Sequence, residues 1–175
     1  MKTLYVLRHS KAGQTNKSIL DDHERPLTEK GIRLCRLVAE DLKRIKAKPD
    51  VVFSSTAKRC IETYEALKPH YFLTCPLETS SQLYLADAME IIKQLRKLSN
   101  DYASALLIGH NPGLHEFCLQ IMARNSEKKL QKELKNQFSP PTLVRFEFDI
   151  KSWKDAAFDG GVLNHYFRAT EGKAD

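Results

Sequence analysis

The chain has 175 residues, of which 42% are hydrophobic and 29% are charged. This length fits one domain, which buries roughly 70% of the surface its unfolded form exposes, so neither a disulfide nor a metal is needed for folding. Seven glycines and seven prolines exclude collagen-like and low-complexity chains. No apolar run approaches the ~20 residues of a membrane span. We therefore expect one globular domain over residues 1–175.

The charge balance is 28 basic against 22 acidic residues, a net charge of +6. Such a balance suits nucleic acid, an acidic membrane or an anionic substrate. The lysines and glutamates of 127–135 alternate at helical spacing, which indicates a solvated surface helix. No basic and aromatic residues interleave as a stacking platform would require. We therefore expect an anionic substrate, with no nucleic-acid or membrane partner, and we interpret 126–136 as a surface insertion.

The cysteines and the N-terminus point to a reducing compartment. No two cysteines are close enough for a CxxC pair, so neither a zinc knuckle nor a redox motif is indicated. The apolar run before Arg8 is too short for a signal peptide. We therefore expect a cytoplasmic protein. The four cysteines are expected to be buried free thiols, namely Cys35, Cys60, Cys75 and Cys118.

In the first half of the chain, short apolar runs alternate with segments of helical spacing. The polar stretch that ends at Pro26 has no periodicity and predicts a long loop. The segment Ser54-Ser55-Thr56 offers N-cap residues for the second helix, and Pro69 ends that helix. In chain order we expect a strand over Leu4–Leu7, a helix from Thr28 to about Ile45, a strand over Val51–Phe53 and a helix from about Ala57 to Leu67.

The second half continues this alternation. Leu73–Leu83 predicts a strand and a loop, and Asn111 suits the N-cap of a helix whose first residue is Pro112. Strands that alternate with helices predict a three-layer α/β/α sandwich with a mostly parallel central sheet. The remaining expected elements are a helix that starts at or near Asp87, a strand over Ser104–Ile108, a helix over Pro112–Ala123, and strands over Leu143–Phe148 and Val162–Phe167.

Cationic and imidazole side chains follow three of the expected strands. In open parallel sheets, ligands bind beyond the carboxyl ends of the strands. If these strands are neighbours, Arg8, His9, Arg59 and His110 converge there. Two arginines and two histidines with no carboxylate among them would form an anion site. Phosphate is the natural occupant, because the planar fork of arginine matches its oxygens.

The same segments resemble the signatures of the histidine phosphatase superfamily, whose fold is phosphoglycerate-mutase-like. The resemblance extends from Leu4 to about Phe117 and points to the SixA-type phosphohistidine phosphatases, which are small and lack large cap insertions. Four segments carry it: Arg8-His9-Ser10 resembles the RHG motif, Ser54-Ser55 with Arg59 and Thr63 resembles SSxxxRxxxT, Gly109-His110-Asn111-Pro112-Gly113 resembles GHNPG, and Glu24-Arg25-Pro26-Leu27-Thr28 with Gly31 is similar to the RPLT segment of that branch.

The resemblance implies a role for each matched side chain. His9 would attack phosphorus and become transiently phosphorylated, as the nucleophilicity of neutral imidazole allows. Arg8, Arg59 and His110 would bind the phosphoryl oxygens, and Arg25 would join them if its loop folds over the pocket. No DxD or histidine-rich ligand set is present, so we expect no metal and no cofactor.

This sequence departs from the superfamily pattern at two places. Ser10 stands where the motif usually has glycine. Many members carry a glutamate as the acid in the middle segment, which SixA-like members often lack. Here Asp87 is the nearby carboxyl group, and it suits a helix N-cap at least as well as an acid.

Several alternatives stay open at this point. Arg8 and Arg59 could be surface ion-pair partners, His110 could be structural, and Arg25 could only fix its loop. The polar residues Ser54, Ser55 and Asn111 are interpreted as caps. Four histidines have no motif context and are treated as non-catalytic, namely His23, His70, His115 and His165.

The expected function is a phosphatase that acts on phosphohistidine in a protein or on a small phosphorylated molecule. The alternatives are a general phosphomonoesterase for sugar or nucleotide phosphates and a phosphate-binding module without turnover. A binding module needs no nucleophile, so the presence of His9 argues against it. A mutase is disfavoured because the chain is too short for substrate-enclosing insertions.

Overall fold

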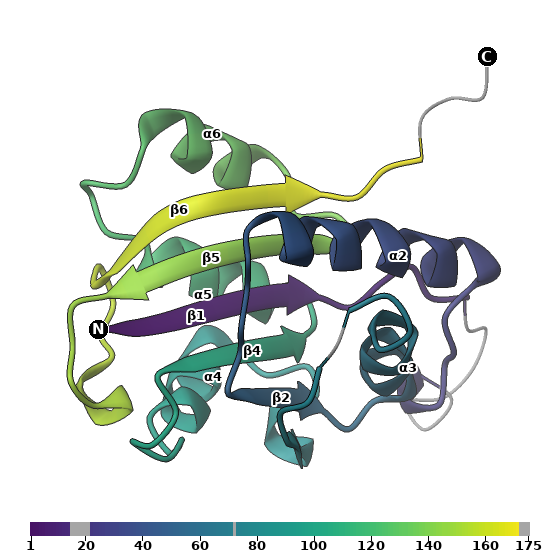
Figure 1. Ribbon diagram of the computed structural model, residues 1–175, viewed down its shortest axis with the longest axis horizontal. Coiled ribbons are helices and arrows are strands. Elements are labelled where there is room, and N and C mark those ends of the chain that lie inside the picture. The colour runs from purple at the N-terminus through teal and green to yellow at the C-terminus, as the bar shows by residue number, and fades with distance from the viewer. Residues whose placement is uncertain (15–21, 72, 172–175) are drawn as a thin grey trace.

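The computed structural model describes residues 1–14, 22–71 and 73–171 and contains one six-stranded sheet (Figure 1). The strand order is β3-β2-β4-β1-β5-β6. The first four strands in this order pair in parallel, and β5 and β6 add antiparallel pairs. The strands are β1 (Lys2–Arg8), β2 (Val51–Ser55), β3 (Leu77–Ser80), β4 (Ser104–Gly109), β5 (Thr142–Phe148) and β6 (Gly161–Arg168).

Helices cover both faces of this sheet (Figure 1). Helices α2 and α3 pack on one face and α4 and α5 on the other, so each face has its own apolar core. The predicted three-layer α/β sandwich is therefore confirmed. The helices are α2 (Glu29–Arg44), α3 (Lys58–Leu67), α4 (Ala88–Leu95), α5 (Gly113–Ile121) and α6 (Lys128–Asn136), with short 3-10 turns η1 (Ser81–Leu83) and η2 (Trp153–Asp155).

The central strand β1 shows why the short apolar runs form buried strands. Successive side chains of a strand point to opposite faces of the sheet. Leu4 and Val6 accordingly lie in the core beneath α4 and α5, and Tyr5 and Leu7 lie in the core beneath α2 and α3. A strand covered on both faces needs apolar residues at every position. This requirement explains the continuous run in the sequence.

Two helix starts agree with the sequence and two do not. The Thr28 hydroxyl accepts a hydrogen bond from Gly31 N at 3.0 Å, and the Asp87 carboxylate accepts one from Glu90 N at 2.7 Å, so both are N-caps as predicted. The N-cap of α3 is instead Ala57, without a side-chain cap. Helix α5 begins one residue later than predicted, after Pro112, which takes the N-cap position from Asn111.

Two further expectations need correction. Leu134 of α6 is fully buried, so the 126–136 segment is attached to the core and is more than a solvated surface element. Cys75 is half-buried, whereas the other three cysteines are buried. The long loop predicted before Pro26 includes residues 15–21, which lie outside the described residues. Among the described residues, no helix is long and apolar enough to cross a membrane.

Candidate active site

The parallel register brings the three motif segments together at one edge of the sheet. Arg8 pairs with Gly109 across β1 and β4, and Ser54 pairs with Ile108 across β2 and β4. A pocket of about 400 Å³ opens beyond these strand ends. It is lined by Arg8, His9, Lys11, Ala12, Asp22, Arg25, Arg59, Leu85, His110, Asn111 and Pro140. The five side chains expected in the site, namely Arg8, His9, Arg25, Arg59 and His110, therefore meet in one pocket.

The imidazole of His9 is buried and held in one tautomer. Its Nδ1 lies 2.7 Å from the carbonyl oxygen of Ser10, which can only accept, so Nδ1 carries the proton. The lone pair is thus on Nε2. Burial lowers the pKa of His9 to about 3, and the positive charges of Arg59 and Arg8 act in the same direction. His9 is therefore neutral near pH 7 and has a nucleophilic nitrogen.

The backbone that carries His9 is fixed by its neighbours in the fold. Ser10 N donates to Thr63 Oγ1 at 2.9 Å, and the Thr63 hydroxyl donates to Arg59 O at 2.6 Å. The Ser10 hydroxyl donates to Gly31 O at 2.7 Å. Ser10 is not among the described residues with positive φ, so its side chain is accommodated without backbone strain where the superfamily motif has glycine.

The second histidine lies against the first. The ring centroids of His9 and His110 are 5.2 Å apart. The ring centroids of Tyr84 and His110 are 5.6 Å apart in a T-shaped contact. His110 Nε2 is 2.7 Å from the Ser55 hydroxyl, so Ser55, interpreted as a cap, orients a histidine of the site. Burial lowers the pKa of His110 to about 2, with smaller contributions from His9 and Arg59. Both imidazoles are therefore neutral at pH 7.

Each arginine of the pocket is held by main-chain or carboxylate oxygens. Arg8 Nη1 donates to Phe138 O at 2.6 Å, and Arg25 Nη1 donates to Gly13 O at 2.8 Å. Arg59, only 1% exposed, donates through Nη1 to the backbone oxygen of Asp22 at 2.6 Å. In each guanidinium the buried Nε has no partner among the described residues. These groups thus retain donors for an anion.

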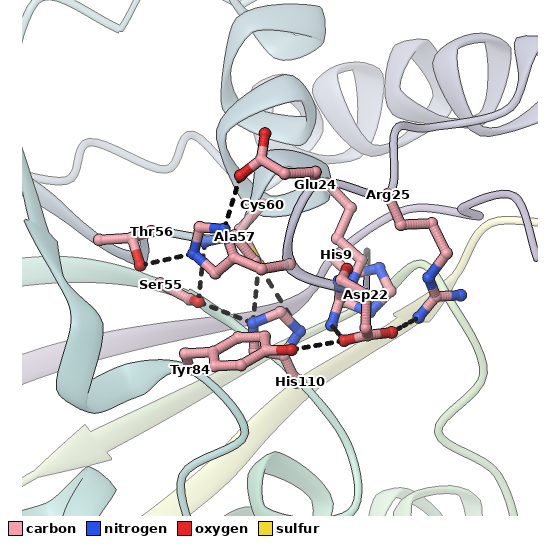
Figure 2. Close-up of polar contacts among 12 residues, drawn as sticks. His9, Asp22, Glu24, Arg25, Ser55, Thr56, Ala57, Cys60, Tyr84 and His110 are labelled. Atoms are coloured by element: carbon pink, nitrogen blue, oxygen red, sulfur yellow. Dashed lines mark hydrogen bonds and ion pairs between the residues drawn. The ribbon is translucent and has the colours of Figure 1, made fainter. Parts of the chain in front are cut away.

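A carboxylate stands among these cations, contrary to the expectation of a carboxylate-free cluster. Asp22 Oδ1 accepts from Arg25 Nη2 at 2.9 Å, and Oδ2 accepts from the Tyr84 hydroxyl at 2.7 Å (Figure 2). Oδ2 also accepts from Arg59 Nη2 at 3.1 Å. Burial alone would raise the pKa of Asp22, but the Tyr84 hydroxyl and both guanidiniums outweigh it and lower the pKa. Asp22 is therefore ionised at neutral pH.

The other carboxyl group considered from the sequence lies outside the pocket. Asp87 is exposed, caps α4 through its bond to Glu90 N, and does not line the pocket. The described residues contain no group of three or more histidine, cysteine, aspartate or glutamate side chains that could hold a metal ion.

Besides Ser55, four contributors to the site were missed or misassigned in the sequence. Asp22 could have been found, because it precedes Arg25 at the i,i+3 spacing of ion pairs in turns and helices. Tyr84 carries no motif. Asn111 is not a cap, because Pro112 holds the N-cap position of α5, and Asn111 Nδ2 donates to Phe138 O at 3.2 Å. The Phe138 carbonyl oxygen, which also accepts a hydrogen bond from Arg8, is a main-chain group for which the sequence offers no signal.

Comparisons with known proteins agree with this fold. Residues 4–84 match the family model of the histidine phosphatase superfamily (branch 1). The fold is similar to that of a candidate phosphohistidine phosphatase SixA from Nakamurella multipartitia, at 25% identity over 97% of each chain with a TM-score of 0.83. It is also similar to the protein histidine phosphatase SixA complexed with tungstate, at 23% identity over 94% of this chain and 95% of that one, with a TM-score of 0.73.

A more distant likeness extends beyond SixA. A candidate alpha-ribazole-5'-P phosphatase from Escherichia coli shares the fold at 13% identity over 98% of each chain, with a TM-score of 0.65. Residues 4–84 therefore match the histidine phosphatase superfamily, and the whole chain is similar in fold to structures named as phosphatases of this kind. The SixA-type resemblance seen in the sequence is confirmed by the similar structures.

Proposed function

We propose that this protein is a phosphatase that uses His9 as its nucleophile and removes phosphate from phosphohistidine in a protein. The observation that carries this proposal is the state of His9, a buried neutral imidazole whose Nδ1 is held by Ser10 O and whose Nε2 is left nucleophilic among three arginines. A neutral imidazole among cations is suited to attack on a phosphate dianion.

In the first step, the Nε2 lone pair of His9 forms a bond to phosphorus. The bond from phosphorus to the leaving atom breaks, and its electron pair stays on that atom. Arg8, Arg25 and Arg59 bind the oxygens of the transferring group and balance their charge in the transition state. His110, 5.2 Å from His9 between ring centroids, lies beside the same group.

In the second step, water attacks the phosphohistidine intermediate. Nδ1 of His9 stays protonated because it donates a hydrogen bond to the Ser10 carbonyl oxygen. The ring phosphorylated on Nε2 is therefore a cation. When water displaces it, the electron pair of the breaking bond returns to Nε2 and His9 leaves as neutral imidazole. The water gives its hydroxyl to phosphorus and its proton to phosphate or solvent. The Ser10 contact thus makes His9 a good leaving group.

The leaving group favours a nitrogen–phosphorus substrate. An alkoxide leaves poorly unless an acid protonates it. Asp22 is ionised, and Asp87 lies outside the pocket. Imidazole leaves readily when it is protonated, without an acid from the enzyme. The similarity to structures named SixA supports the same substrate class.

A small phosphate ester is the second candidate substrate. The observation that favours it is the shared fold of the candidate alpha-ribazole-5'-P phosphatase. Parallel assays with a histidine-phosphorylated protein, p-nitrophenyl phosphate, sugar phosphates and nucleotides distinguish the two candidates. We expect the highest kcat/KM with the phosphohistidine protein.

Trapping the intermediate tests the mechanism itself. The protein is mixed with a histidine-phosphorylated protein carrying ³²P and quenched rapidly in alkaline denaturant, in which phosphohistidine is stable. We expect a label on this chain that is stable to alkali and lost in acid, and no label on His9→Ala. A full label on His9→Ala, or no label with rapid turnover, would refute the nucleophilic role of His9.

A further inference from the structure

The carboxylate of Asp22 is the feature of the pocket that phosphate binding does not explain. An anion site gains nothing from a negative charge placed on two of its arginines. Asp22 nevertheless bonds Arg25 and Arg59 and lines the same pocket as His9. Its side chain is 24% exposed. A group so placed can act toward another part of the substrate.

We infer that Asp22 is a specificity-determining residue, whose carboxylate accepts a hydrogen bond from the protonated imidazole of a phosphohistidine substrate and so selects nitrogen–phosphorus over oxygen–phosphorus bonds. This inference rests on the proposed function. It adds a recognition element for the leaving group, whereas the arginines recognise only the phosphoryl group.

The hydrogen bonds of Asp22 leave room for this contact. An ionised carboxylate has about four acceptor positions on its two oxygens. Oδ2 accepts from Arg59 and Tyr84, and within residues 1–14, 22–71 and 73–171 Oδ1 accepts from Arg25 alone. One acceptor position on Oδ1 is therefore available to an N–H group in the pocket.

The groups that face Asp22 keep it an acceptor. Arg25 precedes α2, Arg59 lies on α3, Tyr84 follows η1, and His110 follows β4. The two guanidiniums are cations, the Tyr84 hydroxyl donates, and His110 is neutral because its pKa is lowered to about 2. Asp22 therefore carries no proton to give to an alkoxide, but it can bind a cationic ring.

The chemistry of the leaving group balances without a proton from the enzyme. The substrate ring carries phosphate on one nitrogen and a proton on the other, and it is a cation. When Nε2 of His9 bonds to phosphorus, the substrate N–P bond breaks and its electron pair neutralises the ring. The ring leaves as neutral imidazole with its N–H still on Asp22. Because an imidazole titrates near neutral pH, the carboxylate keeps the substrate protonated at a pH where it would otherwise lose this proton.

Replacement of Asp22 by asparagine tests the inference, because the amide has the same shape and no charge. The matched control is Glu24→Gln, which removes the same charge two residues away, where the side chain is 72% exposed and contacts His23. The two substrates are a histidine-phosphorylated protein and p-nitrophenyl phosphate, whose leaving group needs no protonation. Both variants are assayed between pH 5.5 and 8.5, a range chosen around the titration of imidazole.

We expect Asp22→Asn to lower the ratio of kcat/KM for phosphohistidine to that for p-nitrophenyl phosphate about ten- to a hundredfold above pH 7, the size of one charge-assisted hydrogen bond. The deficit should shrink toward the acidic end, where the substrate ring protonates unaided. Glu24→Gln should keep the wild-type ratio at every pH.

Two results would overturn the inference and leave the proposed function intact. If both substrates react faster and vanadate binds tighter at an unchanged ratio, Asp22 only competes with phosphate for the arginines. If both substrates slow equally at every pH, Asp22 only positions the arginines. A wild-type protein that hydrolyses p-nitrophenyl phosphate but not phosphohistidine would instead refute the proposed substrate, and the inference with it.

Discussion

The two sides of the pocket are held in different ways. We call the strand-end segments 8–10, 54–55 and 109–110, together with Arg59 of α3, the floor, and the segment 22–25 the wall. The floor is fixed by the β-ladder and by buried bonds such as Ser10 N to Thr63. The wall is fixed by the Arg25–Asp22 ion pair, whose side chains are each 24% exposed, by the Arg25 bond to Gly13 O, and by the bonds from Arg59 to Asp22. Buried main-chain bonds resist salt, and exposed ion pairs are screened. The floor should therefore set the chemistry, and the wall should tune it.

The largest effect is expected from removal of the floor nucleophile. His9→Ala should lower kcat at least about 10³-fold, because it removes the group that forms the covalent bond. Cooperative unfolding, followed by circular dichroism, should persist. His70→Ala, at an exposed histidine outside the pocket, is the control and should keep full activity. Activity of His9→Ala above a tenth of wild type would contradict the assignment.

Arginines of the floor side and of the wall should differ in their contribution. Arg59, 1% exposed on α3, should cost on the order of 10²–10³ in kcat when replaced by alanine, as single donors to a transition state do. Arg25→Ala should cost about tenfold, and less at high salt. Inhibition by vanadate should also weaken more in Arg59→Ala than in Arg25→Ala. Equal losses in the two variants would remove the distinction between floor and wall.

The buried histidines of the floor should make stability depend on pH. The pKa of His9 is lowered to about 3 and that of His110 to about 2, whereas both titrate near 6.5 when unfolded. As pH falls below about 6.5, the unfolded state binds protons that the folded state does not. The free energy of unfolding should therefore fall, by up to about 1.4 kcal/mol per pH unit for each histidine.

Denaturant unfolding of His110→Gln between pH 7 and pH 4, below the titration of free imidazole, measures this contribution. The slope of stability against pH should decrease by up to one proton relative to wild type. His70→Gln should leave the slope unchanged. An identical slope in His110→Gln would mean that His110 is protonated in the folded protein.

A smaller effect is expected at Asp87, which belongs to neither side of the pocket. Asp87→Asn should lower phosphohistidine turnover less than tenfold, below the range of a general acid, and should keep the cap. Asp87→Ala should cost about 1 kcal/mol in the free energy of unfolding. A hundredfold fall in turnover at unchanged stability would make Asp87 the acid and would favour the phosphomonoesterase alternative.

Removal of metal ions should have no effect. The arginines of both sides supply the charge that magnesium supplies in kinases, so activity should survive prolonged dialysis against a chelator. A loss that one specific divalent ion restores would contradict the proposed site.

The difference between floor and wall also explains what the sequence could predict. Arg8, His9 and His110 follow apolar runs long enough to predict strands, and the register of a parallel sheet brings such ends together. Arg25 was predicted only from the resemblance, because its place depends on how its loop packs. The carboxylate of Asp22 and the ring of Tyr84 reach the pocket through side-chain contacts between distant segments, which neither periodicity nor spacing encodes.

The predicted N-caps of the helices also show what local sequence can and cannot predict. Thr28 and Asp87 were predicted correctly because their side chains bond within three residues of the chain. Ser55 and Asn111 have the same capping chemistry, but neither is an N-cap. The Ser55 hydroxyl bonds Ala57 N and His110, and Asn111 Oδ1 has no partner among the described residues. Capping preference alone therefore does not say which polar residue before a helix caps it.

The Phe138 carbonyl has a consequence for mutagenesis. It accepts hydrogen bonds from both Arg8 and Asn111, and it lies just beyond the C-terminus of α6. No side-chain replacement can delete a main-chain oxygen. An alanine scan would therefore test Arg8 but would overlook the Phe138 carbonyl oxygen that orients its guanidinium. The path of the backbone between Asn136 and Pro140 is the variable to change, through insertion or deletion of a single residue. We therefore expect chain length in this connection to affect the position of Arg8, an effect that substitution libraries do not sample.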